Sequence, residues 1–444
     1  MRIRVITIGS QGDVRPYVAL GIGLQNAGHD VIIVTHPSFE PLVRERGLRF
    51  APVAGDPREQ ADNRQLRALH DDGRNLFRWW RTFNEVDAPL MRQRLRDCWE
   101  ACSDAEVIVA SILPYLFGYA IARKLDIPLV RAFYFPVSPT RAYPPDVVPA
   151  WLRLPGRANL AAYGLQRQVL WQVARPWVAG ACRGILGLSS MPFLEPFGEL
   201  DRRQQLLLYA YSAAVSPPPP DWGPWIDVTG YWFLDRTAEW TPPPGLADFL
   251  EKGPAPVYVG GFGSMTNREP AEMARTVARA LSLAGQRAIV LTGWGGLAPS
   301  ELPPEIFAVD WVPFDWLFPR IAAVVHHGGA GTTAASLRAG VPTIVVPFFL
   351  DQFYWGRRVF DLGVGPRPIP RKRLQAEALA EALREATCNS EMRQRATALG
   401  KRIRAEDGVA RAVASFQRYM QVPAGIETTQ AGTRADAAQA GLRS

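Results

Sequence analysis

The sequence predicts an α/β protein with two domains, each built around a parallel β-sheet. Short apolar runs typical of buried strands alternate with segments of helical periodicity through most of the 444 residues. A stiff proline run, Ser216 to Pro220, interrupts this alternation, and a second proline cluster follows at 242–244. We therefore expect a first domain over 1–215, a linker over 216–245, a second domain over 246–420 and a disordered tail over 421–444.

Composition is that of an ordinary globular protein, with 48% hydrophobic and 21% charged residues. The chain opens in a strand-like segment without the pattern of a signal peptide, and no run of 18 apolar residues occurs. The four cysteines are scattered, which favours free thiols over disulfides or a zinc site. These features predict a cytoplasmic protein.

The net charge of +8 comes mostly from arginine. It is compatible with an anionic nucleotide ligand or with peripheral contact to an acidic membrane surface. A compositional bias towards arginine explains it equally well. No nucleic-acid-binding motif accompanies the charge, so a nucleic-acid partner is not expected.

The stretch from 322 to 352 carries the clearest functional signal. A buried strand at 322–325 leads into HHGGAGTT, a short helix ends at Gly340, and a second strand at 343–348 precedes Asp351 and Gln352. Glycines let a backbone approach a phosphate, and the N–H groups at a helix start favour negative charge. Acceptors and donors on the Asp–Gln pair suit a polyhydroxylated group. A phosphate beside a sugar predicts a nucleotide sugar as ligand.

The start of the chain predicts a second loop at the carboxyl edge of a sheet. A strand at 3–8, the loop GSQGD, a helix from 14 to 26 and a strand at 31–35 form a βαβ unit. Open α/β sheets bind ligands at this edge. Asp13 lies in the loop, where it could serve catalysis, cap the helix, or do both. His36, at the end of the second strand, is expected to be structural.

HHGGAGTT followed by PFFLDQFYWGRRV resembles the donor-binding signature of the family 1 glycosyltransferases, which have the GT-B fold of two Rossmann-like domains facing a cleft. GSQGDVRPYVAL and FAPVAGDP are similar to other markers of the family. The sterol glucosyltransferase branch and its bacterial natural-product relatives are the nearest in pattern. Neither the P-loop nor the G-x-G-x-x-G pattern fits these segments.

The resemblance implies roles for individual residues. Asp13 would be the catalytic base, His327 would contact phosphate, and Trp311 would stack on the nucleotide base unless it is a core residue. The other expected donor-binding residues are Ser264, Val312, Gly329, Ala330, Gly331, Thr332, Asp351 and Gln352. Possible additional site residues are Ser10, Gly12, Gly263 and His326. His326 is expected to close its strand, although the two histidines could exchange roles.

Two positions depart from the wider family. Ala335 stands where many members carry a glutamate that grips the ribose, a lack shared by the sterol branch. No clear counterpart exists near Ser111 of the second acid that orients the base in some members. The choice between UDP and dTDP therefore stays open.

The leading prediction is an inverting transferase that moves glucose from UDP-glucose to a hydrophobic acceptor such as a sterol. No D-x-D motif occurs and there are only five histidines, so no metal and no cofactor are expected. The alternatives are a natural-product glycosyltransferase that uses a dTDP- or UDP-sugar, and a non-catalytic nucleotide-binding activator. An aromatic amphipathic pattern from Leu76 to Leu90 predicts an acceptor-pocket wall or a membrane-resting face.

Overall fold

The computed structural model describes residues 1–56, 88–145, 148, 154–236, 240–260, 270–292, 303–348 and 351–421. Three expectations fall mainly outside these residues: most of the amphipathic segment from Leu76, the loop with Gly263 and Ser264, and the tail beyond Gln421.

The first domain is built on a seven-stranded sheet in which every described pairing is parallel. Its order is β3-β2-β1-β4-β5-β6-β7. The strands are β1 (Arg2–Ile6), β2 (Asp30–Thr35), β3 (Arg49–Pro52), β4 (Val107–Ala110), β5 (Leu129–Phe133), β6 (Leu207–Tyr209) and β7 (Ile226–Val228). The helical segments are α1 (Gln11–Asn26), η1 (Pro37–Phe39), α2 (Glu40–Glu45), α6 (Ala88–Cys102), α7 (Tyr115–Leu125), α8 (Gly156–Leu186) and α9 (Pro196–Arg202). The predicted α/β class is confirmed.

The second domain repeats this design with a five-stranded parallel sheet of order β10-β9-β8-β11-β12. The strands are β8 (Val257–Val259), β9 (Ala288–Leu291), β10 (Ile306–Val309), β11 (Ala323–His326) and β12 (Thr343–Val345). The helical segments are α10 (Leu246–Glu251), α11 (Pro270–Ala284), α12 (Phe314–Leu317), η4 (Phe318–Arg320), α13 (Ala330–Ala339), α14 (Asp351–Asp361), η5 (Arg371–Arg373), α15 (Ala376–Cys388), α16 (Ser390–Arg404) and α17 (Gly408–Gln421).

In each sheet the direction in which successive strands are added reverses once, beside β1 in the first sheet and beside β8 in the second. The chain leaves β1 towards β2 and β3, then returns to the other side of β1 with β4; in the second sheet β8 is flanked in the same way by β9 and β11. The loops after β1 and β11 therefore lie at the switch points of their sheets, where α/β folds bind ligands.

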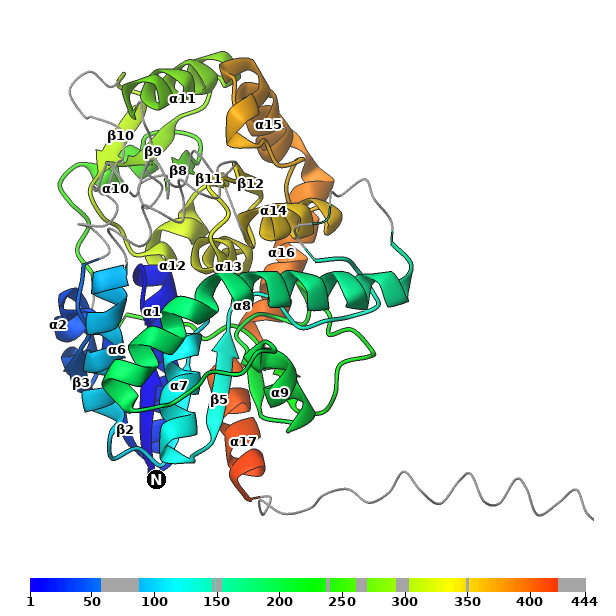
Figure 1. Ribbon diagram of the computed structural model, residues 1–444. Helices are drawn as coiled ribbons and strands as arrows, with labels where there is room; N and C mark the ends of the chain where they lie inside the picture. The colour runs from blue at the N-terminus through cyan, green and yellow to red at the C-terminus, as the bar shows by residue number, and fades with distance from the viewer. Residues whose placement is uncertain are drawn as a thin grey trace, which may run out of the picture.

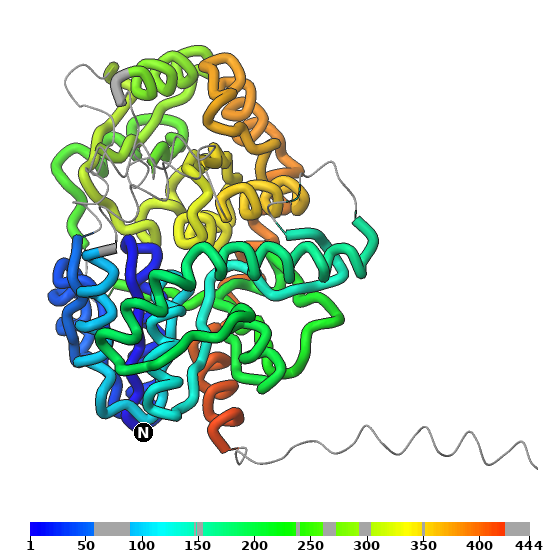
Figure 2. The backbone as a smooth tube through the Cα atoms, in the orientation of Figure 1, coloured from blue at the N-terminus to red at the C-terminus, as the bar shows by residue number. Residues whose placement is uncertain are grey.

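The last helix crosses back from the second domain to the first. Val413 and Phe416 of α17 are buried in the same apolar cluster as Val14 and Val18 of α1. A Cβ atom on Gly23 of α1 would come within 3.0 Å of Val413, so the two helices pack closely. Figures 1 and 2 show α17, in red, beside the first sheet. Residues of the expected second domain thus stabilise the first.

The expected linker also contributes to the first sheet. β7 lies within 216–245 and pairs with β6, with Ile226 opposite Leu207. The proline run at 216–220 therefore precedes the last strand of the first sheet instead of separating two finished domains.

Two strands of the first domain each bury an arginine side chain, which their apolar pattern does not predict. Arg4 of β1 is fully buried, and two of its nitrogens, Nε and Nη2, donate to the carboxylate of Asp104. Arg131 of β5 is also fully buried and donates to Asp201 of α9 over 2.6 Å. Buried charges persist only when they are paired and hydrogen-bonded.

Asp201 also anchors α8. Arg167 of α8 donates to the other oxygen of this carboxylate over 3.2 Å, and its second nitrogen donates to the carbonyl of Val137. One carboxylate therefore holds two cations from β5 and α8.

We expect Asp201→Asn to destabilise the protein by about 3 kcal/mol, because it removes the carboxylate charge with which two largely buried guanidinium groups pair. The measurement is the free energy of unfolding by urea titration. The matched control is Glu377→Gln, which removes an exposed pair with Arg279 and is expected to cost less than about 1 kcal/mol. Equal effects of the two changes would contradict the role assigned to Asp201.

Candidate active site

The loops after β1 and β11 bring the starts of two helices together across the two domains. A Cβ atom on Gly331 of α13 would lie 3.4 Å from the Cα atom of Gly12 in α1. Figure 1 shows the start of α1 just below the part of the second domain that holds α12 and α13. Two helix N-termini, each with unsatisfied N–H groups, therefore face the same region between the domains.

The loop after β1 is shaped to fold a carboxylate back onto the chain. Gly9 has φ of +130°, and a Cβ atom on it would lie 2.5 Å from Oδ2 of Asp13. Any larger residue would displace that carboxylate. Oδ2 of Asp13 accepts hydrogen bonds from the backbone N–H of Ser10 over 2.7 Å and from its hydroxyl over 2.9 Å. Asp13 thus takes part in the capping of α1, as one of the two expected roles requires.

The other carboxylate oxygen of Asp13 faces the carboxyl end of β5. Oδ1 accepts a hydrogen bond of 2.6 Å from the hydroxyl of Tyr134, the first residue after that strand. Burial raises the pKa of Asp13 above its ordinary value, while the hydrogen bonds from Tyr134 and Ser10 act in the opposite direction. A carboxylate with a raised pKa is a stronger base than one in water.

His36 supports this loop from behind. Its Nε2 accepts from the backbone N–H of Gly9 over 3.3 Å, and its Nδ1 lies 3.3 Å from the carbonyl of Val53. Burial lowers the pKa of His36 to about 4, so the ring is neutral at physiological pH. Both ring nitrogens contact the backbone, which is the structural role expected of this residue.

The loop after β11 separates the two histidines. His326 is fully buried, and its Nδ1 accepts from the backbone N–H of Gly328 over 3.0 Å. The ring of His327 instead lies over the start of α13, with Nε2 2.5 Å from the position that a Cβ atom on Gly329 would take. Among the described residues, Nε2 of His326 and Nδ1 of His327 each lack a hydrogen-bond partner, but His327 is half-buried whereas His326 is fully buried. His327, and not His326, is therefore placed to meet a ligand at this helix start.

The glycines of this loop allow its close packing. Gly328 has φ of +95°, and a Cβ atom on it would lie 3.0 Å from the carbonyl oxygen of Gln352. Gly329, Ala330, Gly331 and Thr332 then open α13 without a side-chain cap, so the first N–H groups of the helix keep their binding capacity.

Asp351 and Gln352 begin α14 beside the same loop. Gln352 is buried, and its side-chain oxygen accepts from the backbone N–H of Phe348 over 2.8 Å, which fixes the orientation of its amide. The charge of Asp351 contributes to the raised pKa of Tyr134, after burial and the charge of Asp13. Two carboxylates from different domains therefore lie near one tyrosine hydroxyl.

Trp311 and Val312 follow β10 and belong to neither the loop after β1 nor the loop after β11. Trp311 is 51% exposed, so it is not the core tryptophan that the sequence left as an alternative. Its ring contacts Trp240 edge-on, with 6.1 Å between centroids. Val312 is buried. Gly263 and Ser264 lie outside the described residues, so their contribution stays a prediction.

Tyr134 is the site residue that the sequence analysis missed. The signal was present, because FYFP follows a buried strand and so places a tyrosine at the carboxyl edge of the sheet. Nothing in the sequence shows that this strand brings Tyr134 to Asp13, since β4 lies between β1 and β5 in the sheet.

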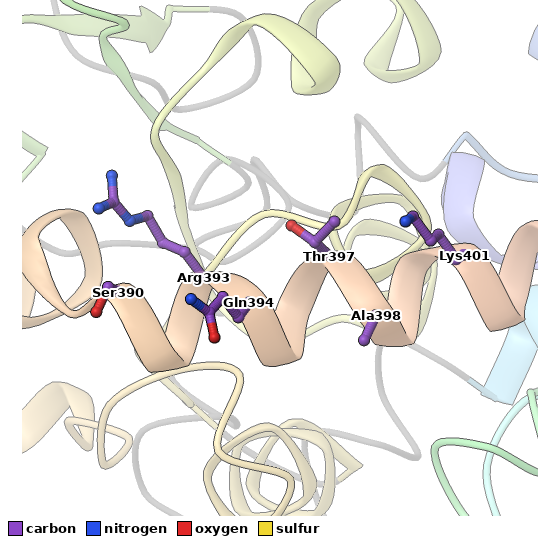
Figure 3. A pocket seen from close by; sticks show the side chains of 6 residues that line it. All are labelled: Ser390, Arg393, Gln394, Thr397, Ala398 and Lys401. Carbon is purple, nitrogen blue, oxygen red and sulfur yellow. The ribbon is translucent and has the colours of Figure 1, made fainter.

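A hollow of about 400 Å³ along α16 is separate from these residues (Figure 3). It is lined by Ser390, Arg393, Gln394, Thr397, Ala398 and Lys401. The backbone of Thr397 packs against Gly340, at the opposite end of α13 from His327. A helix of ten residues is about 15 Å long, so this hollow does not belong to the site.

Within the described part of the chain, no three His, Cys, Asp or Glu side chains are grouped so that they could hold a metal ion. The described helices include none that is long and apolar enough to cross a membrane. All four cysteines are free thiols, and Cys98, Cys102 and Cys182 are buried.

Comparison with known proteins agrees with this geometry. Residues 3–144 match the glycosyltransferase family 28 N-terminal domain, and residues 289–415 match the C-terminal domain of erythromycin biosynthesis protein CIII-like proteins. A solved glycosyltransferase of kitacinnamycin superposes with a TM-score of 0.67 at 21% identity, over 94% of this chain and 98% of that one. The calicheamicin glycosyltransferase CalG4 gives 0.63 at 21%, over 96% and 100%.

Two fungal relatives are similar along almost the whole chain. A sterol 3-beta-glucosyltransferase of Neosartorya fischeri is 41% identical over 433 residues, and one of Cryptococcus neoformans is 38% identical over 450. Each match covers 95% of this chain, which spans only 30% and 27% of those longer proteins. Two parallel sheets whose carboxyl edges face each other define the GT-B class. The chain has the GT-B fold, and its sequence is similar to those of the sterol 3-beta-glucosyltransferases.

We expect His36 and His327 to stay neutral down to about pH 4, because burial lowers the pKa of each to about 4. Their lowered pKa values imply that stability falls as pH decreases from about 6.5 to about 4, where the unfolded chain binds protons that the folded chain does not. NMR titration of the histidine ring signals measures both midpoints, with His36→Gln and His327→Gln for assignment. A midpoint near 6.5 for His327 would contradict its burial.

Proposed function

We propose that this chain moves glucose from UDP-glucose to a hydroxyl group of a hydrophobic acceptor, a sterol or a similar lipid or aglycone, with inversion and without a metal. The observation that supports this most is the placement of the half-buried Asp13 carboxylate opposite the uncapped start of α13. The extensive similarity to proteins named sterol 3-beta-glucosyltransferase supports a sterol or a similar lipid as the acceptor.

In the proposed reaction the acceptor oxygen attacks the anomeric carbon from the face opposite the diphosphate. The new bond joins the acceptor oxygen to that carbon, the bond between carbon and diphosphate oxygen breaks, and its electron pair leaves with UDP. Asp13 receives the proton of the attacking hydroxyl. An alcohol is a far weaker acid than a carboxylic acid, so the proton moves late, as the new bond forms.

The start of α13 suits the departing diphosphate. The first N–H groups of α13 and the helix dipole stabilise the negative charge that develops there. His327 lies over this helix start. Because its pKa is lowered to about 4, the ring is neutral, and it can donate one N–H to the diphosphate but adds no positive charge. In this proposal Ser264 adds a hydroxyl to the diphosphate, while Trp311 and the backbone of Val312 bind the nucleotide base.

Asp351 and Gln352 are proposed to hold the sugar. Carboxylate and amide groups beside the cleft suit a fully hydroxylated hexose, because a deoxysugar would leave part of their hydrogen-bonding capacity unmatched. Asp351 lies near Tyr134, which donates to Asp13, and this supports a sugar position between the start of α14 and Asp13.

A natural-product transferase that uses a dTDP-sugar is the first alternative. The glycosyltransferase VinC, solved in complex with dTDP, superposes with a TM-score of 0.62 at 19% identity. Ala335 leaves the ribose without the acid found in many relatives, so either nucleotide is compatible with the site. The second alternative is a non-catalytic activator that binds nucleotide, which would have no need of an Asp13 carboxylate.

The test is transfer measured by mass spectrometry, with UDP-glucose and dTDP-glucose against sterols and polyphenols in the presence of EDTA. Transfer from UDP-glucose to a sterol supports the proposal, including metal independence. Transfer only from dTDP-glucose or only to planar aglycones would favour the natural-product alternative. UDP binding without any turnover would favour the activator.

We expect Asp13→Asn to lower turnover by about 100- to 10,000-fold, the usual contribution of a general base. Affinity for UDP, measured by calorimetry, is expected to stay within about twofold, because the proposed nucleotide contacts lie in the other domain. Asp126→Asn is the matched control, since Asp126 is exposed at the end of α7. Unchanged turnover in Asp13→Asn would rule out its role as base.

A peripheral lipid contact is part of the proposal, and α8 offers a surface for it (Figure 1). This 31-residue helix contains four arginines and no acidic residue. Its exposed face is apolar between Arg157 and Arg183, and the adjoining loop adds two exposed apolar side chains. The exposed apolar residues of α8 and this loop are Leu165, Val169, Leu170, Val173, Phe193 and Leu194. Such a surface suits the interface of an acidic bilayer.

We expect the protein to sediment with vesicles of phosphatidylcholine and phosphatidylglycerol, and less at high salt, because salt screens the arginine contribution. The double change Phe193→Ser and Leu194→Ser should weaken this binding, whereas Leu283→Ser, at an exposed site on α11, should not. Self-association through α8 without vesicle binding would contradict the lipid contact. Cytoplasmic location stays a prediction from the sequence.

A further inference from the structure

The two oxygens of the Asp13 carboxylate are not equivalent. Oδ2 accepts two hydrogen bonds, both from Ser10, whereas Oδ1 accepts one, from Tyr134. A carboxylate oxygen has about two lone-pair directions for acceptance. Oδ2 is therefore fully used, and Oδ1 retains one direction in which it can accept a proton.

Tyr134 is a fixed donor to that oxygen. It follows β5 directly and is half-buried, and its ring contacts Phe135 with 5.5 Å between centroids. Burial, together with the charges of Asp13 and Asp351, raises the pKa of Tyr134 well above its ordinary value. The phenol therefore stays protonated and donates to the carboxylate, and it does not act as a proton relay.

We infer that Tyr134 is a positioning residue that holds the Asp13 carboxylate so that Oδ1 is the atom that receives the proton of the acceptor hydroxyl. This inference rests on the proposed function. The hydroxyl of Ser10, the backbone N–H of Ser10 and the hydroxyl of Tyr134 act from two sides, so rotation of the carboxylate would break at least one short bond.

The proton balance of the step follows from this arrangement. The acceptor O–H bond breaks and its proton binds the remaining lone pair of Oδ1. Tyr134 keeps its own proton throughout, and the electron pair of the broken carbon–oxygen bond leaves with the diphosphate. A hydrogen bond to the carboxylate is stronger than one to the neutral acid, so Tyr134 makes Asp13 a weaker base. Its benefit is orientation, which alone can be worth about 100-fold in rate.

Tyr134→Phe tests the inference, because it removes only the hydroxyl. Tyr115→Phe is the matched control: Tyr115 is a buried tyrosine of the first domain whose hydroxyl has no hydrogen-bond partner among the described residues. For Tyr134→Phe we expect kcat to fall by about 10- to 100-fold, with KM for UDP-glucose within about twofold.

The pH profile separates a positioning role from a merely structural one. The hydrogen bond from Tyr134 lowers the pKa of Asp13, so its loss raises that pKa. The acidic limb of kcat/KM should then move to higher pH in Tyr134→Phe and stay in place in Tyr115→Phe. An unmoved limb with kcat within twofold of the wild type, or an equal change in both variants, would overturn the inference.

A readout that does not depend on turnover distinguishes this inference from the proposed function. Carboxyl ¹³C NMR of aspartate-labelled protein gives the pKa of Asp13, assigned by the signal lost in Asp13→Asn. A higher pKa in Tyr134→Phe supports the hold of Tyr134 on the Asp13 carboxylate even if the wild type transfers no sugar, in which case the proposed function fails while this contact stands. An unchanged pKa overturns the inference even if the wild type is active.

Discussion

The close approach of Gly12 and Gly331 is the constraint on which the rest of the site depends. A Cβ atom on Gly331 would already be in van der Waals contact with the Cα atom of Gly12, so α1 and α13 meet at their first turns, at the carboxyl edges of the two sheets. Because both helices begin at this contact, their unsatisfied N–H groups face a common space. The carboxylate of Asp13 lies in the first turn of α1, and the ring of His327 lies over the start of α13.

Several contacts outside the cleft maintain this relation between the domains. The hydroxyls of Ser216 and Tyr354 lie 2.5 Å apart, and Arg358 of α14 donates twice to the carbonyl of Val215. Arg338 of α13 forms a two-nitrogen pair with Asp235 in the segment between the domains. α17 adds an apolar contact, since it extends from the second domain into the core of the first. The elements that carry the site, α13 and α14, are therefore tied directly to the first domain.

Much of the fold could be predicted from the sequence, because it depends on local patterns. Continuous apolar runs such as Ala322 to Val325 indicate strands that are buried on both faces, and glycines such as Gly28 and Gly340 end helices because they adopt positive φ. The charged residues that are buried within the strands could not be predicted in this way. Arg4 and Arg131 lie inside sheets because Asp104 and Asp201, 100 and 70 residues away, neutralise them.

The sequence by itself determined the α/β class, the two loops at the sheet edges and the identity of Asp13, His327, Asp351 and Gln352 as candidates. These features follow from spacing within one segment. The tertiary structure alone decided which residues meet: it brought Tyr134 to Asp13 across β4, assigned His327 and not His326 to the start of α13, and returned α17 to the first domain. Strand order and domain contact join residues that are far apart in the chain, and no local pattern records such pairings.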